Sequence, residues 1–355
     1  TTGFGNNVVN FKYNWGHSQL GVTYNINYRN YNKRILDENM TYAVGGKTYQ
    51  KQKTGKNSPY AYEQQLAEIS FNNSKPDNYI FSTKLSFNSL NRRRSSKQDI
   101  FSTIDDVVFE KFGESSDKDK YISPVMDMYF SKTFNAKHEL TMNLVGTYYK
   151  SDYDYRYSEL SGGVTDFETA TNINLDKYSF IGEAVYNYNM KTAQLYVGSR
   201  YMYNNSTQKN LPSNNRTLTN EIYSYLGIAG MLGKKFNYSV SAGVNGNIFT
   251  TIENKEYKFV YFRPQVKLGY FIDESSDLTF NYEVNTENPA ISSLTYNPYF
   301  KDANYLYVGN PNLKPSNNHD LSLSYFKGFK KFVISAEVAY SYNKDAIAPV
   351  FQSDD

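Results

Sequence analysis

The side chains that could carry out chemistry are scattered along this sequence rather than grouped. The three histidines, His17, His138 and His319, stand far apart. A zinc site needs several converging ligands, so we predict no metal site. His319-Asp320 followed by Ser322 suggests a catalytic triad, but neighbouring residues in a strand point to opposite faces. A histidine base and its orienting carboxylate could not meet there, and we predict that the protein is not an enzyme and has no cofactor.

Clusters of like charge are the next candidates. Asp105-Asp106 and the pair Asp152/Asp154 could offer oxygen ligands to calcium, but they lack the regular spacing of a calcium-binding loop. We interpret them as solvated loop charge. Arg92, Arg93 and Arg94 end a predicted strand. Their planar guanidinium groups could pair with the phosphates of lipid, or they could form a charged rim that stays in water.

A loop rich in aromatic residues is the best candidate for binding a ligand. It spans residues 292–307 and contains Tyr296, Tyr299, Phe300, Tyr305 and Tyr307. Exposed rings on a loop could stack on a sugar, a peptide or a cofactor. The alternative is that these rings pack against the loop itself or against a partner protein.

The composition limits which elements could position these residues. Aromatic residues make up 17% of the 355, with 36 Tyr and 23 Phe, while only 39% of the chain is hydrophobic. A disordered chain is poor in aromatics, and no apolar run reaches the roughly 20 residues of a transmembrane helix. A net charge of +3 gives no case for nucleic-acid binding. The absence of cysteine excludes disulfides and thiolate sites.

Apolar and polar residues alternate along nearly the whole chain. The stretch Leu278–Asn285 alternates without exception, and Leu20–Arg29 does the same. A period of two indicates strands with one apolar and one polar face. About fourteen strands are predicted, many longer than the ~5–6 residues that are usual in soluble proteins. They cover residues 7–15, 19–34, 62–72, 79–92, 121–133, 139–156, 177–189, 193–207, 219–232, 236–252, 258–272, 277–288, 318–327 and 331–344.

Short and long connections alternate between these strands, except that the connection 253–257 is short where a long one would be expected. The long ones fall near residues 36–60, 93–120, 157–176, 208–218 and 289–317. Short turns on one side and long loops on the other are typical of an outer-membrane β-barrel, whose short turns face the periplasm. We therefore predict an all-β fold, a transmembrane antiparallel up-and-down barrel. A soluble all-β sandwich or propeller is the alternative.

The placement of aromatic and charged residues favours the membrane. Tyr and Phe gather at strand ends, where they would form girdles at the bilayer interface; Tyr28, Tyr148, Tyr153, Tyr155, Tyr157, Tyr201 and Tyr340 are examples. Charged residues within strands fall on the polar faces and should point into the lumen. They are Lys12, Lys84, Arg200, Arg263, Lys267, Glu183, Glu283 and Glu337. On the lipid face, a Lys or Arg near the midplane would cost ~2–4 kcal/mol.

The direction of the terminal strands carries a further expectation. Strand 7–15 runs down to a short turn and strand 331–344 runs up from one, so both ends of the sequence should lie outside the cell. Bacterial single-chain barrels have an even number of strands and short periplasmic turns. We expect residues 1–355 to be one barrel domain that is incomplete, with an odd number of strands lacking at each end.

One segment resembles a known family. Gly309, Asn310, Pro311, Asn312, Leu313, Lys314 and Pro315 follow the aromatic loop and precede a strand. This segment is similar to the GNPxLKPE motif in the barrel of TonB-dependent outer-membrane receptors, of the type abundant in Bacteroidota. Ser316 stands where that motif has Glu.

The resemblance implies properties that periodicity cannot show. It implies a barrel of about 22 strands, the size class of plugged transporters. It also implies a plug domain outside these residues and energy from the TonB complex. A surface lipoprotein lid or other envelope proteins would be further partners, beside outer-membrane lipid. The function expected is TonB-dependent uptake of a nutrient; the alternative is a barrel with a structural, assembly or scaffold role in an envelope complex.

Overall fold

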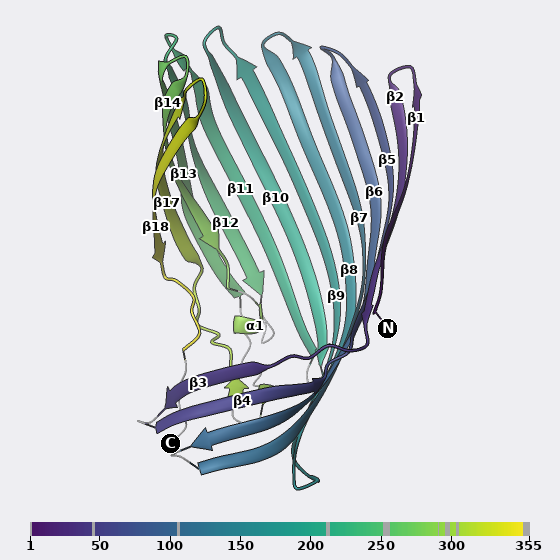
Figure 1. Ribbon diagram of the computed structural model, residues 1–355. Coiled ribbons are helices and arrows are strands. Elements are labelled where there is room, and N and C mark those ends of the chain that lie inside the picture. Colours follow the sequence, from purple (N-terminus) through teal and green to yellow (C-terminus); the bar gives the residue numbers. More distant parts are fainter. Residues whose placement is uncertain are drawn as a thin grey trace.

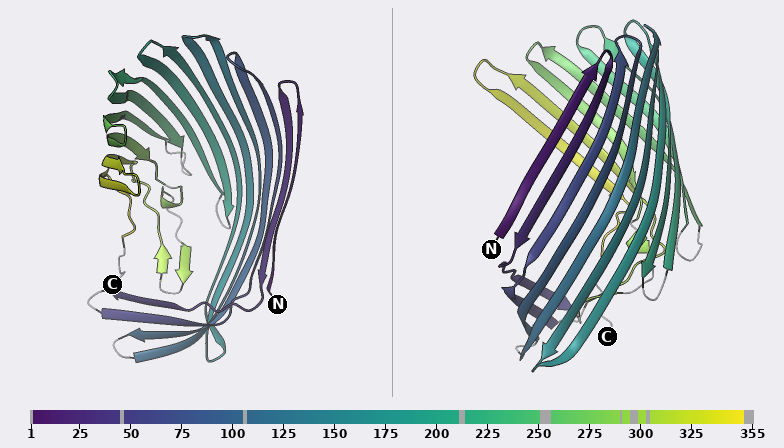
Figure 2. Two further views of the ribbon diagram at one scale, coloured as in Figure 1. Left: turned by 45° about the horizontal axis from the view of Figure 1, so that its top comes forward. Right: turned by 90° about the vertical axis from the view of Figure 1, so that its right-hand side faces the viewer.

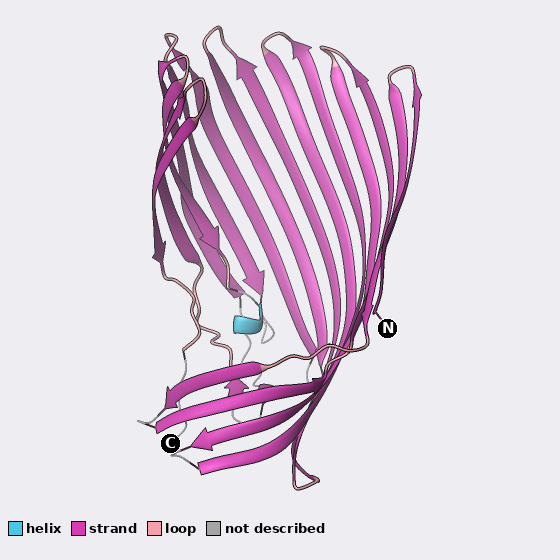
Figure 3. Cartoon of the chain, viewed as in Figure 1, coloured by secondary structure: helices cyan, strands magenta, loops and turns pink. Residues whose placement is uncertain are grey.

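The computed structural model describes residues 2–44, 47–104, 107–210, 214–250, 256–289, 291–294, 299–302 and 305–350. Within them, strands joined by hydrogen bonds form one large antiparallel sheet (Figures 1 and 3). Fourteen strands follow one another in the wall of this sheet: β1 (Thr2–Trp15), β2 (Ser18–Tyr31), β5 (Tyr60–Lys75), β6 (Tyr79–Ile104), β7 (Val107–Asn135), β8 (His138–Ser161), β9 (Val164–Asn189), β10 (Ala193–Asn210), β11 (Asn214–Leu232), β12 (Phe236–Thr250), β13 (Glu256–Asp273), β14 (Ser276–Glu287), β17 (Ser316–Gly328) and β18 (Val333–Lys344).

The fourteen predicted strands are confirmed, and so is the up-and-down order. Each wall strand pairs with the wall strands before and after it, and the edge strands β1 and β18 have one neighbour each. Inserted elements separate β2 from β5 and β14 from β17 along the chain, but these strands still pair in the wall. The sheet curves into a trough that forms part of a barrel wall (Figure 2). β1 and β18 lie at its two edges and do not pair with each other in the described part of the chain.

The two faces of the wall follow the alternation of the sequence. The convex face carries exposed apolar side chains such as Val260 (75% exposed), Leu226 (66%) and Phe262 (63%). Their sequence neighbours on the concave face are polar or aromatic, including Tyr261 and Arg263. An apolar outer band with a polar interior is the arrangement of a transmembrane barrel. The described helix, α1 (Ile291–Leu294), has four residues, and no helix in the described ranges is long and apolar enough to cross a membrane.

Several segments predicted as long loops are strands instead. Residues 36–60 contain the hairpin β3 (Glu38–Val44) and β4 (Lys47–Asn57), and β4 pairs with the distal half of β6. Residues 93–120 continue β6 and β7, the latter to 29 residues. Most residues on both faces of these extensions are polar, as expected where strands project beyond the lipid, so the regular alternation that marks a membrane strand is absent. We call β3, β4 and the paired distal ends of β6, β7 and β8 the outer lobe; it bends across one end of the trough (Figure 1).

The predicted aromatic girdle needs one correction. Tyr28, Tyr148, Tyr201 and Tyr340 alternate onto the convex face, where the prediction placed them. Tyr153, Tyr155 and Tyr157 instead lie on the concave face, opposite Asp119, Asp117 and Ser115 of β7. Tyr157 is buried in the outer lobe. The sequence period predicts strand ends for all of these residues, but it does not show how far β8 continues beyond the membrane.

Candidate functional site

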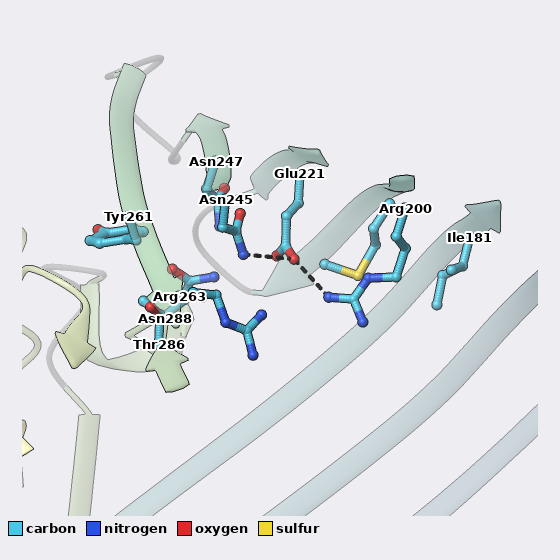
Figure 4. Close-up of a pocket in the computed structure, with 10 residues that line it drawn as sticks. Ile181, Arg200, Glu221, Asn245, Asn247, Tyr261, Arg263, Thr286 and Asn288 are labelled. Atoms are coloured by element: carbon cyan, nitrogen blue, oxygen red, sulfur yellow. Dashed lines mark hydrogen bonds and ion pairs between the residues drawn. The ribbon is translucent and has the colours of Figure 1, made fainter. Parts of the chain in front are cut away.

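A recess of about 300 Å³ opens on the concave face of the wall, toward the end where the outer lobe lies (Figure 4). It spans strands from β9 to β14. Its lining is mostly polar and consists of Ile181, Arg200, Met202, Glu221, Asn245, Asn247, Tyr261, Arg263, Thr286 and Asn288. Because every second residue of a strand faces inward, neighbouring strands bring their side chains to one place. Six strands, β9 to β14, carry these residues, apart from Asn288, which follows the end of β14.

Glycine–tyrosine contacts shape the wall beside the recess. A Cβ added to Gly198 would overlap the ring of Tyr225, and one added to Gly243 would overlap the ring of Tyr223. The glycines therefore allow these rings to lie close to the backbone of the adjacent strand. Tyr223 and Tyr225 stack with centroids 5.1 Å apart. The result is a flat aromatic surface next to the charged groups.

Charged groups in the recess are held by defined partners. Arg200 Nη2 donates to Glu221 Oε1 at 3.0 Å, and Asn245 Nδ2 donates to the same oxygen at 3.1 Å. Arg263 Nη2 donates to Asn285 Oδ1 at 2.8 Å, and its guanidinium lies 4.7 Å from the centre of the Tyr223 ring. Glu221 is buried and satisfied by two donors, which is what a buried carboxylate requires. Arg263 is held by neutral groups and a ring.

Three polar atoms in the recess have no hydrogen-bond partner among the described residues. They are Asn245 Oδ1, Asn247 Oδ1 and Tyr261 Oη. Asn245 is 6% exposed and Asn247 is 2% exposed. Buried polar atoms in folded proteins nearly always have partners, and leaving one without costs ~1–3 kcal/mol. This recess therefore has unused hydrogen-bonding capacity.

An aromatic ladder extends from the recess toward the outer end of β12 and β13. Phe249 stacks on Tyr257 at 4.9 Å and on Phe259 at 5.7 Å, and Phe259 stacks on Tyr261 at 6.0 Å. These residues alternate onto the concave face of their strands. The hydroxyl of Tyr257 donates to the carbonyl of Pro311, which joins the ladder to the GNPNLKP segment.

That segment, Gly309–Pro315, forms a turn that leads into β17. Asn310 Oδ1 accepts a hydrogen bond from the backbone N–H of Asn312 at 2.9 Å. The backbone N–H of Asn310 donates to the Ser293 carbonyl at 2.7 Å. The predicted strand does begin directly after it, at Ser316. The segment thus links Ser293 and the start of β17 to Tyr257 of the wall.

The predicted aromatic loop is described in part. Tyr296 lies outside the described residues. Tyr299 and Phe300 belong to β15 (Tyr299–Asp302), which pairs with β16 (Tyr305–Tyr307), and only the backbone of Tyr299, Phe300 and Tyr305 is described. Tyr307 Oη lies 3.4 Å from Ser293 Oγ. A ligand-binding role for these five residues remains a prediction.

The three arginines lie within β6 rather than at its end. Arg92 Nη2 pairs with Asp119 at 2.8 Å, and Arg94 forms a bidentate pair with Asp117. Arg93 points to the other face, opposite Lys118. Lipid-phosphate contact remains a prediction for all three. Because Arg92 and Arg94 are held by Asp119 and Asp117, Arg93 and its neighbour Lys118 are the residues best placed to contact lipid phosphate.

The histidines lie where strand geometry places them. His17 is in the turn between β1 and β2, His138 contacts Tyr186, and His319 packs beside Tyr282 and Tyr342. His319 and Asp320 face opposite sides, and Asp320 accepts from Ser341 Oγ at 2.5 Å. No three His, Asp or Glu side chains of the described ranges gather as metal ligands. Asp105 and Asp106 lie outside the described residues.

The outer lobe contains a buried ionic cluster that the sequence did not suggest. Glu159, 1% exposed, accepts from Tyr157 Oη at 2.7 Å, Lys51 Nζ at 3.2 Å and Lys111 Nζ at 3.2 Å. Burial alone would raise the pKa of Glu159, but the Tyr157 hydrogen bond and the two ammonium groups outweigh it and lower the pKa below its ordinary value. Lys111 also pairs with Asp166, and this hydrogen bond raises the pKa of Lys111.

Sequence reasoning identified part of the recess. It placed Arg200 and Arg263 on the luminal face, and the structure brings them to the same recess. It missed Glu221, Asn245, Asn247 and Tyr261. Their polar positions follow from the alternation, but the register between strands, which brings them together, depends on long-range pairing.

The fold and its two faces define a transmembrane β-barrel wall, and comparisons with known proteins agree. Residues 233–355 match the model of the outer membrane protein beta-barrel family. No curated protein sequence matches the chain. Among solved structures, the chain is similar to the ferric-catecholate import receptor Fiu of Escherichia coli K12, with a TM-score of 0.52 and 8% identity. That match covers 87% of this chain and 58% of Fiu.

A second similar structure is BauA, the ferric preacinetobactin receptor of Acinetobacter baumannii, with a TM-score of 0.43 and 10% identity over 96% of this chain and 62% of BauA. The chain therefore spans less than two thirds of either receptor. The chain has the fold of an outer-membrane β-barrel wall and is located in the bacterial outer membrane.

Proposed function

We propose that this chain is the barrel portion of a TonB-dependent receptor that takes up a nutrient across the outer membrane, of the type abundant in Bacteroidota. The observation that carries the proposal is the polar recess on the luminal wall, with unpartnered hydrogen-bonding atoms at the lobe end of a receptor-like barrel. The GNPNLKP segment, Gly309–Pro315, supports the family assignment. The protein is a transporter and not an enzyme.

The open edges support a larger barrel. Unpaired backbone groups of β1 and β18 could not remain in hydrocarbon, because nothing there satisfies their hydrogen bonds. Further strands of the whole protein would close the wall, and a plug would fill the wide lumen. The TonB complex would supply energy through that plug, and a surface lipoprotein lid would be a further partner at the outer opening.

The test compares uptake with and without TonB in cells that produce the complete receptor. Depletion of solutes from a defined medium is measured by mass spectrometry in cells with the receptor, without it, and with the receptor but without TonB. We expect at least one solute whose depletion requires both. Receptor-dependent depletion that persists without TonB, or no receptor-dependent depletion, would reject the proposal and favour the scaffold role.

A further inference from the structure

Half of the unpartnered buried polar atoms lie together in the recess. Six buried side-chain atoms of the described residues lack a hydrogen-bond partner, and three of them, Asn245 Oδ1, Asn247 Oδ1 and Tyr261 Oη, line the recess. Both asparagines are more than nine-tenths buried. On an open wall, water would satisfy such atoms. These three atoms instead line one recess of about 300 Å³, so the edge of a single small ring could reach all of them.

The orientation of Asn245 shows which chemistry is missing. Its Nδ2 donates to Glu221 Oε1 at 3.1 Å. A flipped amide would turn its oxygen toward that carboxylate, and two acceptors would then face each other. The amide oxygen must therefore point away from Glu221, as an acceptor that needs a donor. A carboxylate or phosphate has no donor to offer, whereas a hydroxyl group does.

Donors and an aromatic face complete the lining. Arg263 is held by Asn285 and Tyr223, and it retains guanidinium N–H groups for a ligand oxygen. Tyr261 contributes a hydroxyl and the last ring of the ladder that begins at Phe249. Flat apolar ring surfaces combined with planar amide and guanidinium groups suit a ring that is apolar on its faces and hydroxylated at its edge. Figure 4 shows Tyr261, Arg263 and the two asparagines among the residues that line the recess.

We propose that the recess is a binding subsite for one ring of an uncharged, polyhydroxylated ligand, a carbohydrate. The ring hydroxyls would donate to Asn245 Oδ1 and Asn247 Oδ1 and accept from Arg263, while a ring face rests on Tyr261. The aromatic ladder from Phe249 to Tyr261 would contact further units of the same chain outside the recess. The proposal of this subsite rests on the proposed receptor function, and it specifies the class of substrate that the receptor would take up.

The test is direct binding to the complete receptor in detergent, without TonB. Isothermal titration is carried out with maltohexaose, cellohexaose, xylohexaose and mannohexaose, and with acetate and benzoate as anionic probes. We expect at least one oligosaccharide to bind and the anions not to bind. Asn245→Ala should weaken that binding about tenfold, because a buried donor–acceptor pair is lost. Asn247→Ala should act in the same direction.

Asn281→Ala is the matched control. Asn281 also lies on the luminal face, but it donates to Ser322 Oγ at 3.3 Å and is not part of the recess. Its substitution should leave binding unchanged, and heat-modifiable electrophoretic mobility verifies that each variant is folded. The proposal is overturned if no oligosaccharide binds, if an anion binds instead, or if Asn281→Ala weakens binding as much as Asn245→Ala.

A structure of the complete chain with plug groups bonded to both amide oxygens would also overturn the proposal. The subsite and the receptor function fail in different ways. Oligosaccharide binding without TonB-dependent uptake rejects the transport function alone. TonB-dependent uptake that Asn245→Ala leaves unchanged rejects the subsite alone.

Discussion

Glu159 holds the outer lobe together, and its neutralisation should loosen that lobe locally. In Glu159→Gln the amide can still accept from Tyr157, but the negative charge between Lys51 and Lys111 is gone. Lys51 is 5% exposed and would lose the carboxylate oxygen that it meets at 3.2 Å. Breaking a buried ion pair by removing one member costs ~3–5 kcal/mol. Lys111 is more exposed and keeps Asp166, so we expect the lower end, ~3 kcal/mol.

Hydrogen–deuterium exchange measures this change where it occurs. About 1.4 kcal/mol corresponds to a factor of ten, so peptides covering residues 47–57 should exchange roughly 100–200 times faster in Glu159→Gln. Glu114→Gln is the control in the same lobe. Glu114 pairs with Lys97 at 2.9 Å, and the two side chains are exposed, Lys97 at 59% and Glu114 at 43%. Such a pair should contribute under about 1 kcal/mol to the stability of the lobe. The double variant Lys51→Met/Glu159→Gln should regain protection, because the positive charge that Glu159 balances is removed together with the negative one.

The same cluster predicts a pH dependence. Because the folded pKa of Glu159 lies below its unfolded value, near 4.5, its stabilisation is fully present above that value. It is lost as the pH falls through the folded pKa. Protection in the wild-type lobe, measured relative to the intrinsic exchange rate at each pH, should therefore fall below about pH 4.5, and Glu159→Gln should lack that step. Equal exchange in Glu159→Gln and Glu114→Gln, or a wild-type lobe insensitive to acid, would refute the reasoning.

Three further outcomes test the wall itself. Leu226→Arg on the convex face should destabilise the barrel by ~2–4 kcal/mol in urea titrations in lipid vesicles, whereas Gln265→Arg, luminal and opposite Glu283, should change it little. Gly198→Val should displace the Tyr225 ring and cost ~1–3 kcal/mol in the same titration; no change would contradict the close contact. Arg93→Ala should lower the phosphate of co-purified lipid, whereas Arg94→Ala, which breaks the Asp117 pair, should not; equal losses would reject the assignment to Arg93.

The corrections to the sequence analysis share a physical cause. Alternation marks a strand only where one face meets lipid and the other meets the lumen, so the membrane strands were predictable from Leu278–Asn285 and similar stretches. In the outer lobe both faces meet water or protein, and the sequence of β4 or of distal β6 has no such contrast. These strands were therefore predicted as loops. Tyr157 was assigned to an interfacial girdle for the same reason.

The sequence by itself determined the all-β class, the wall strands and the face on which each charge lies, because these depend on neighbours one or two positions away along the chain. Only the tertiary structure decided which of those charges meet. Arg200 and Glu221 lie 21 residues apart, and Lys51 and Glu159 lie 108 apart. Their encounter depends on strand register and on the bend of the outer lobe. Pairing between distant segments sets both, and periodicity along one strand contains no information about it.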